Sequence, residues 1–219
     1  MKAPRTPRRR IVVVGAGGFA RETLDVIEDL TAAGSERFTV AGVVDAAPDD
    51  LKLSRLHARG VSYLGDDDEW LRHPTADYFA VAIGDPAIRR ELVARYSASG
   101  LTPVTLVHPG AAVGRLTFIG TGSIICAGVV VSTNVQLGHH VHLNPNATIG
   151  HDARLAAFVS VNPGAIVSGE VTIGERALIG AGAVILEGRS VAEGCVVGAS
   201  ACVTKDLPAG AIVKGVPAR

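Results

Sequence analysis

The chain has 219 residues, and its 21 Lys and Arg balance 21 Asp and Glu to a formal net charge of zero. A neutral chain lacks the basic excess that binders of nucleic acids and anionic membranes use to neutralise phosphates, so neither partner is expected. Hydrophobic residues make up 47% of the chain, which excludes a disordered protein, but only 4% are aromatic and 26 residues are Gly. Aliphatic and small residues must therefore fill the core.

The compartment is predicted from the cysteines and from targeting signals. Cys126, Cys195 and Cys202 form no C-x-x-C pair and no even set, as expected for reduced, packed thiols. No secretory signal pattern opens the chain, and its apolar runs are too short to span a bilayer. We therefore expect a cytoplasmic protein.

Residues 1–10 are predicted to form a flexible N-terminus, and residues 11–106 a small Rossmann-like βαβ domain with a parallel sheet. The basic residues of the terminus are Lys2, Arg5, Arg8, Arg9 and Arg10. Apolar runs predict strands at 11–14, 38–45 and 78–85, and helical periodicity predicts helices up to about residue 33 and over about 87–98. Leu24, Ile27 and Leu30 should form the apolar face of the first helix.

The glycine turn at Gly15, Gly17 and Gly18 lets backbone amides approach a phosphate at a helix N-terminus. Asp45, at the end of the second strand, can accept a hydrogen bond from a ribose hydroxyl or a base. A G-x-G-x-x-A pattern alone is weak evidence for NAD, and the domain is too short for both halves of a dinucleotide fold. A nucleotide joined to something other than nicotinamide is the better prediction, and an NAD-linked oxidoreductase is an alternative that a titration with NAD would test.

Residues 107–219 carry a six-residue repeat. Sixteen consecutive positions, spaced by six from Val113 to Val203, are all Ile, Leu or Val. Four residues after each of them comes a small or β-branched residue, except at Arg189. A period of six fits neither an α-helix nor a heptad coil. It fits a triangular coil in which each hexapeptide supplies one strand and one corner.

Three hexapeptides make one turn of this coil, so residues 18 apart should stack and pair as parallel strands. Residues 113–203 would then give about five turns. Gly often follows the aliphatic residue, and we expect it to permit the backbone conformation of the corner. These glycines are Gly120, Gly138, Gly150, Gly174, Gly180 and Gly198.

Several segments resemble those of the hexapeptide-repeat sugar O-/N-acyltransferases, the NeuD/PglD-like family of sialic acid O-acetyltransferases and nucleotide-aminosugar N-acetyltransferases. They are VVVGAGGFARE (12–22), VAIGDPAIRREL (81–92), VHPGA (107–111), NPNATIGHD (144–152), VNPGAIVSG (161–169) and VVGASACVTKDLPAGAIVKGVPAR (196–219). The resemblance covers nearly the whole chain from Ile11 to Arg219. It implies a left-handed parallel β-helix over residues 107–219 and acetyl-CoA as the acyl donor.

The resemblance assigns catalysis to three residues. His151 matches the general base, Asp152 the acidic residue that raises its basicity, and Asn144 a residue that lines the acetyl site. Elementary chemistry agrees, because an amine or hydroxyl must lose a proton as it attacks a thioester, and a His that titrates near neutrality can take it.

The resemblance also implies where the substrates and partner subunits lie. Coenzyme A should lie along the coil, in a cleft between subunits, at Ser160, Gly169, Gly180, Ala181 and Ala199. Ser160 matches a second His that several members use to contact the acetyl group. The nucleotide sugar should lie at Gly17, Gly18, Phe19, Asp45, Ala46 and Gly84. Three coils packed about an axis would make three equivalent clefts, so we expect a homotrimer.

The remaining histidines invite a metal interpretation, because His139, His140 and His142 lie close together in the sequence. Acyl transfer needs no metal, and these corner positions should face different ways. We therefore expect no metal site.

The leading hypothesis is acetyl-CoA-dependent N-acetylation of a nucleotide-linked aminosugar, a reaction of polysaccharide biosynthesis. A sugar O-acetyltransferase is an alternative, because amines and alcohols need the same base. A non-catalytic, nucleotide-sugar-binding scaffold is another, although a scaffold has no need of the His151–Asp152 pair. The nucleotide, the sugar and the length of the acyl group stay open.

Overall fold

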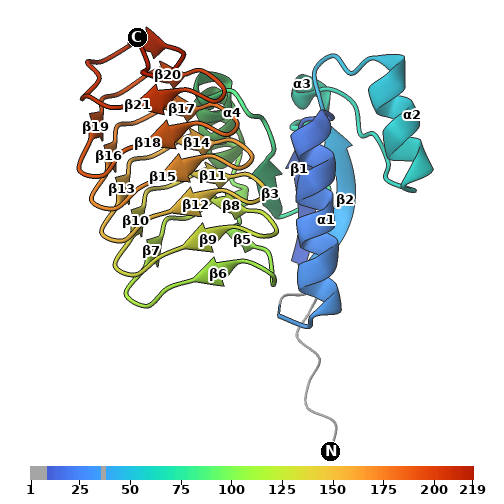
Figure 1. Ribbon diagram of the computed structural model, residues 1–219. Coiled ribbons are helices and arrows are strands. Elements are labelled where there is room, and N and C mark those ends of the chain that lie inside the picture. Colours follow the sequence, from blue (N-terminus) through green and yellow to red (C-terminus); the bar gives the residue numbers. More distant parts are fainter. Residues whose placement is uncertain (1–8, 36–37) are drawn as a thin grey trace, which may run out of the picture. The chain divides into compact units, whose positions relative to one another are not determined.

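The computed structural model describes residues 9–35 and 38–219, which divide into two compact units (Figure 1). The first unit contains residues 9–83 and 91–104, and the second contains residues 84–90 and 105–219. Most of the predicted flexible N-terminus, residues 1–8, lies outside the described residues. Arg9 and Arg10 correct that prediction, because they begin the first strand and pair with Phe38 and Thr39.

The first unit is built on a parallel sheet with the strand order β2-β1-β3-β4. Its strands are β1 (Arg9–Val14), β2 (Phe38–Val44), β3 (Tyr78–Val81) and β4 (Thr102–Pro103). Ile11, Val12 and Val13 of β1 are fully buried, as expected for a central strand of a parallel sheet that is covered on both faces. The prediction of a Rossmann-like βαβ arrangement is confirmed.

Helices connect these strands. They are α1 (Gly18–Ala32), α2 (Asp50–Ala58), α3 (Asp67–Trp70) and α4 (Pro86–Ala98). Leu24, Ile27 and Leu30 of α1 are buried, which confirms the predicted apolar face. Asp49 caps α2 by accepting a hydrogen bond from the backbone N–H of Lys52. No helix in the described part of the chain is long and apolar enough to cross a membrane.

The second unit is a parallel β-helix of about six turns, whose two-residue strands stack into three sheets (Figure 1). The seven-stranded sheet contains β5 (Leu106–Val107), β8 (Ile124–Ile125), β11 (His142–Leu143), β14 (Ser160–Val161), β17 (Leu178–Ile179), β20 (Val196–Val197) and β22 (Ile212–Val213). The six-stranded sheet contains β6 (Ala112–Val113), β9 (Val130–Val131), β12 (Thr148–Ile149), β15 (Ile166–Val167), β18 (Val184–Ile185) and β21 (Cys202–Val203). The five-stranded sheet contains β7 (Phe118–Ile119), β10 (Gln136–Leu137), β13 (Arg154–Leu155), β16 (Thr172–Ile173) and β19 (Ser190–Val191).

The register confirms the predicted repeat. Leu137 pairs with Leu155, and Leu155 pairs with Ile173, so neighbours are 18 residues apart. From Ile125 to Val203, every aliphatic residue of the series is buried, with at most 3% of its surface exposed. Cys126 and Cys195 are buried free thiols, as predicted, and Cys202 is partly buried.

The glycines after the aliphatic residues have a different reason from the predicted one. At the first five of them a Cβ atom would lie 2.4–2.7 Å from the backbone of the next turn, so a side chain has no room. The left-handed backbone conformation occurs two residues further on, and often in a residue other than Gly, as at Asn134 (φ 57°), Asp152 (φ 61°) and Phe158 (φ 61°). These glycines thus permit close stacking of turns, whereas the corner conformation falls on the later residue.

Candidate active site

His151 and Asp152 lie on the corner between β12 and β13, which we call the His151 corner. Asp152 has the left-handed backbone conformation of that corner. Its Oδ2 lies 2.8 Å from Nδ1 of His151, and half of the His151 side chain is exposed. With Nδ1 turned to the carboxylate, the imidazole can offer the lone pair of Nε2 to a substrate.

Asn134 extends this pair to three residues. It lies on the same corner one turn earlier, and its Nδ2 donates a hydrogen bond of 2.6 Å to Oδ1 of Asp152. Each carboxylate oxygen of Asp152 therefore has its own partner. The sequence interpretation missed Asn134, although the 18-residue spacing between stacked corners would have identified it.

Gly169 makes room for the imidazole. It lies one turn after His151, and a Cβ atom there would be 2.6 Å from both Cε1 and Nε2 of the ring. The ring can lie over the backbone of the next turn only because this residue has no side chain. Sequence interpretation linked Gly169 to coenzyme A, and the structure adds this packing against His151.

The charges of the corner favour the protonated imidazole and the ionised carboxylate. The hydrogen bond with Asp152 raises the pKa of His151, and the negative charges of Asp152, Glu187 and Glu170 add to the effect. The hydrogen bond from Asn134 is the main reason that the pKa of Asp152 is lowered, followed by the hydrogen bond with His151. Such a pair accepts a proton more readily than an isolated His does.

This arrangement predicts a pH dependence. A general base works only when it is neutral, so kcat/KM should rise with pH through a pKa above the ordinary His value of 6.5. Asp152→Asn removes the carboxylate that raises the pKa, and the acid limb should move to lower pH. An amine substrate titrates identically with both proteins, so the difference between the two profiles isolates His151. An acid limb at the same pH in both proteins would contradict the assignment.

The other predicted catalytic residue lies on a different corner. Asn144 follows β11, on what we call the Asn144 corner, and its Nδ2 donates to the carbonyl oxygen of Val161 at 3.0 Å. The six-stranded sheet lies between this corner and the His151 corner. Asn144 and His151 are therefore at opposite ends of one side of the triangular coil.

The predicted coenzyme A contacts divide between the same two corners and one sheet. Gly180, Ala181 and Ala199 share the Asn144 corner, and a Cβ atom at Gly180 would lie 2.6 Å from the backbone nitrogen of Ala199. Gly169 lies on the His151 corner. Ser160 lies on neither, because it begins β14 in the seven-stranded sheet.

Ser160 belongs to a buried polar cluster around Arg89, a residue that sequence interpretation missed. The Ser160 hydroxyl, 1% exposed, donates to the carbonyl oxygen of Gly84 at 2.9 Å and accepts from Arg89 at 3.0 Å. Arg89 also donates to the carbonyl oxygen of Phe158 at 2.6 Å and lies 3.1 Å from Nδ1 of His142. Burial lowers the pKa of the Arg89 guanidinium to about 9.

The clustered histidines have different partners. His140 stacks on Phe158 with ring centroids 5.1 Å apart, and burial lowers its pKa to about 4. His139 accepts a hydrogen bond from the backbone nitrogen of Thr121 through Nδ1. Within residues 9–35 and 38–219, no group of three or more His, Cys, Asp or Glu is arranged to hold a metal ion.

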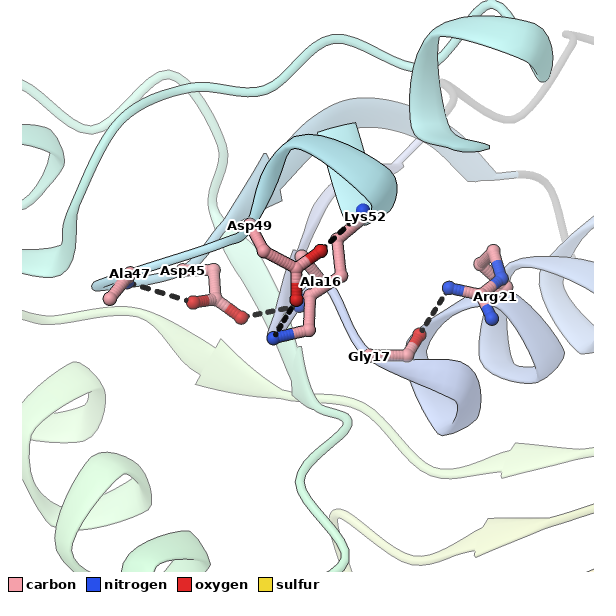
Figure 2. Close-up of polar contacts among 7 residues, drawn as sticks. All are labelled: Ala16, Gly17, Arg21, Asp45, Ala47, Asp49 and Lys52. Carbon is pink, nitrogen blue, oxygen red and sulfur yellow. Dashed lines mark hydrogen bonds and ion pairs between the residues drawn. The ribbon is translucent and has the colours of Figure 1, made fainter. Parts of the chain in front are cut away.

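In the first unit, the glycine turn opens the N-terminus of α1 (Figure 2). Gly15 has φ +109°, and a Cβ atom there would be 2.6 Å from Cδ1 of Ile83, so the first glycine is needed for the turn itself. Gly17 is the N-cap, and no described atom lies within 4 Å of its Cβ position. The first amides of α1 thus face open space, the usual setting for binding a phosphate.

Asp45 fixes this turn to the end of β2. Its Oδ2 accepts from the backbone nitrogen of Ala16 at 2.7 Å, and its Oδ1 accepts from that of Ala47 at 3.0 Å (Figure 2). A carboxylate has about four acceptor positions, so the two that remain can still receive a ribose hydroxyl or a base. Phe19 and Ala46 flank the turn and are partly or fully exposed. The exposed Gly84 lies in the second unit.

Two cations near the glycine turn were not identified from the sequence. Arg21 donates from Nη1 to the carbonyl oxygen of Gly17 at 3.3 Å. Lys52 is paired with Asp49 at 3.2 Å, beside Asp45 in the view of Figure 2. Both side chains come from the first turns of helices, and they add positive charge to the neighbourhood of the α1 N-terminus.

Comparison with known proteins gives a consistent result. Residues 10–96 match the family model of the PglD N-terminal domain. Over 148 residues, 67% of the chain, the sequence is 33% identical to GDP-perosamine N-acetyltransferase of Escherichia coli O157:H7, and the match spans 64% of that protein.

Two solved structures match almost throughout. The structure of PerB from Caulobacter crescentus in complex with CoA and GDP-perosamine is 35% identical, with a TM-score of 0.83 and 95% of both chains covered. The acetyltransferase domain of PglB from Neisseria gonorrhoeae is 31% identical, with a TM-score of 0.81, 97% of this chain covered and 99% of that one. The fold is therefore a Rossmann-like unit followed by a left-handed parallel β-helix, as predicted.

Proposed function

Because the chain belongs to the NeuD/PglD-like family of hexapeptide-repeat sugar acyltransferases, we propose that it transfers the acetyl group of acetyl-CoA to an amino group of a nucleotide-linked sugar. The observation that carries the proposal is the exposed His151, whose Nδ1 is held by Asp152 and whose ring lies over Gly169. The similarity to GDP-perosamine N-acetyltransferases supports an amine as acceptor and a nucleoside diphosphate as carrier.

In the proposed reaction, the amino nitrogen attacks the thioester carbonyl, and Nε2 of His151 takes the proton that the nitrogen loses. A C–N bond forms, the C–S bond breaks, and the thiolate of coenzyme A leaves. Asp152 stabilises the imidazolium while the proton resides on it, and the proton then passes to the sulfur or to solvent. The products are the amide and free coenzyme A.

The first unit is the proposed binding site for the nucleotide. The open amides of the α1 N-terminus suit the diphosphate, and the positive charges of Arg21 and Lys52 favour it. The free acceptor positions of Asp45 suit the nucleoside. Acetyl-CoA chemistry and free cysteines suit a reaction in the cytoplasm.

A homotrimer would complete the proposed site. Asn144 and His151 are on different corners, so both can act on one acetyl group if the Asn144 corner of one chain meets the His151 corner of another. The outward side chains of the six-stranded sheet between these corners are suited to such packing, since Thr148 is their one strongly polar member. They are Ala112, Val130, Thr148, Ile166, Val184 and Cys202. On the five-stranded sheet the corresponding residues are mostly polar.

Ile166→Glu should therefore abolish trimer formation. Ile166 is 42% exposed in the single chain, and a charge buried in the proposed interface would be unpaired. Sedimentation should give a trimer for the wild type and a smaller species, with little coenzyme A release, for the variant. Thr172→Glu, which places the same side chain on the five-stranded sheet, is the control and should remain trimeric. A wild-type monomer would exclude the shared site.

The proposed function is tested by measuring coenzyme A release with matched acceptors. UDP-, GDP- and dTDP-linked 4-aminosugars are compared with the same nucleotide sugars carrying a hydroxyl at that carbon. Release with an amine and none with its hydroxyl partner is the expected result. Release only with hydroxyls would favour O-acetylation, and nucleotide-sugar binding without any release would favour a non-catalytic scaffold.

A further inference from the structure

We propose that Asn134 is a positioning residue for the general base, a role that rests on the proposed function. Its amide lies 2.6 Å from Oδ1 of Asp152, and Oδ2 of the same carboxylate lies 2.8 Å from Nδ1 of His151. The three side chains form one hydrogen-bonded series that ends at the imidazole.

The exposure of the pair explains why a second anchor is needed. The side chains of His151 and Asp152 are 50% and 44% exposed, so water competes for their single hydrogen bond. A carboxylate held at one oxygen alone can rotate away from the ring. Asn134 holds the other oxygen, so the carboxylate keeps its orientation and Nδ1 keeps its partner. Nε2 is then left to accept the proton of the substrate.

The backbone of the corner does not by itself require Asn at this position. The left-handed conformation occurs at each stacked position of the His151 corner, which holds Leu116, Asn134, Asp152, Glu170 and Gly188. Leu116, with φ 60°, lies one turn before Asn134 and has no amide. The fold accepts a leucine in this conformation, so the amide of Asn134 needs another explanation, and its contact with Asp152 supplies one.

The charged groups that surround this series determine the signs of the expected shifts. Glu170 and Glu187 act on His151 together with Asp152, and Arg154 acts on Asp152. Asn134→Asp keeps the shape but replaces the donor with a further negative charge, which should raise the pKa of His151. Asn134→Leu removes the donor without adding charge, so it loosens Asp152 and should lower the pKa of His151.

The test uses NMR titration of His151 in the full-length, substrate-free protein, together with pH profiles of kcat/KM. The titration midpoint should move up in Asn134→Asp and down in Asn134→Leu, and the acid limb of each pH profile should move with it. In Asn134→Leu, kcat should fall on the order of 10-fold, the loss typical when a hydrogen bond that orients a functional His is removed, while KM for acetyl-CoA stays near the wild-type value.

Arg176→Leu is the matched control, because Arg176 has the same left-handed conformation (φ 59°) on a corner away from His151. It should show the wild-type titration and the same thermal unfolding temperature as Asn134→Leu. If neither Asn134 variant moved the His151 titration, the proposal would be wrong. If the titration moved as expected but the wild type released no coenzyme A with any acceptor, the proposed function would fail and the hydrogen-bonded series would stand.

Discussion

His151→Ala should lower kcat by about 10²–10⁴-fold, the usual consequence of losing a positioned proton acceptor. The affinity for acetyl-CoA should change little, because the positions predicted to bind it are glycines and alanines, which offer only backbone and small apolar contacts. Steady-state kinetics with a saturating aminosugar acceptor would measure kcat, and calorimetry would measure the affinity for coenzyme A. Asp152→Asn should have a smaller effect, since it leaves the imidazole in place.

The control for this experiment must be another exposed His. His139→Ala is suitable, because His139 is exposed and contacts only the backbone nitrogen of Thr121 among its recorded hydrogen bonds. His142 is unsuitable, because it is buried against Arg89 and its loss would disturb that cluster. If His151→Ala kept most of its turnover and His139→Ala lost it, the active site would lie on a different corner of the coil.

Arg89→Met should destabilise the protein by about 2–5 kcal/mol, because it leaves buried hydrogen-bond acceptors without their donor. The acceptors are the carbonyl oxygen of Phe158 and the hydroxyl of Ser160, and Arg89 itself has no exposed surface. Methionine has a similar length and fills much of the space, so the loss of hydrogen bonds dominates. Arg89→Lys should be intermediate, since one ammonium group cannot reproduce the forked geometry of a guanidinium.

Urea denaturation at fixed protein concentration would measure this effect as a shift in the midpoint. Arg90→Met is the control, since Arg90 is the exposed neighbour of Arg89 and lies 3.9 Å from Glu175 in a surface ion pair. That pair contributes little, so the control should lie within about 0.5 kcal/mol of the wild type. Equal midpoints for Arg89→Met and Arg90→Met would show that the buried cluster contributes no stability.

The coil could be predicted from the sequence because one inward aliphatic side chain recurs at every sixth residue. The number of turns was underestimated at the C-terminal end for a physical reason. Val213 pairs with Val197, 16 residues earlier, so the last turn is shorter and leaves the six-residue phase. The role of the glycines was also misjudged, because close stacking of turns is a property of neighbours 18 residues apart and does not appear in one hexapeptide.

The candidate site was predictable where its residues are adjacent in the sequence or obey the repeat. His151 and Asp152 are neighbours, and Asn134 and Gly169 are each 18 residues from a member of the pair. The Arg89 cluster was not predictable in this way. It joins one helix residue to His142 and Ser160, which are 53 and 71 residues further along, and no period relates them.

The location of the reaction is the central claim, and a crystal structure with coenzyme A and a GDP-linked aminosugar would test it most directly. The proposal predicts the sugar nitrogen at a hydrogen-bond distance of about 2.6–3.2 Å from Nε2 of His151, with the diphosphate at the N-terminus of α1. An amino group bound beside any other His of the chain, with His151 facing solvent, would contradict the account.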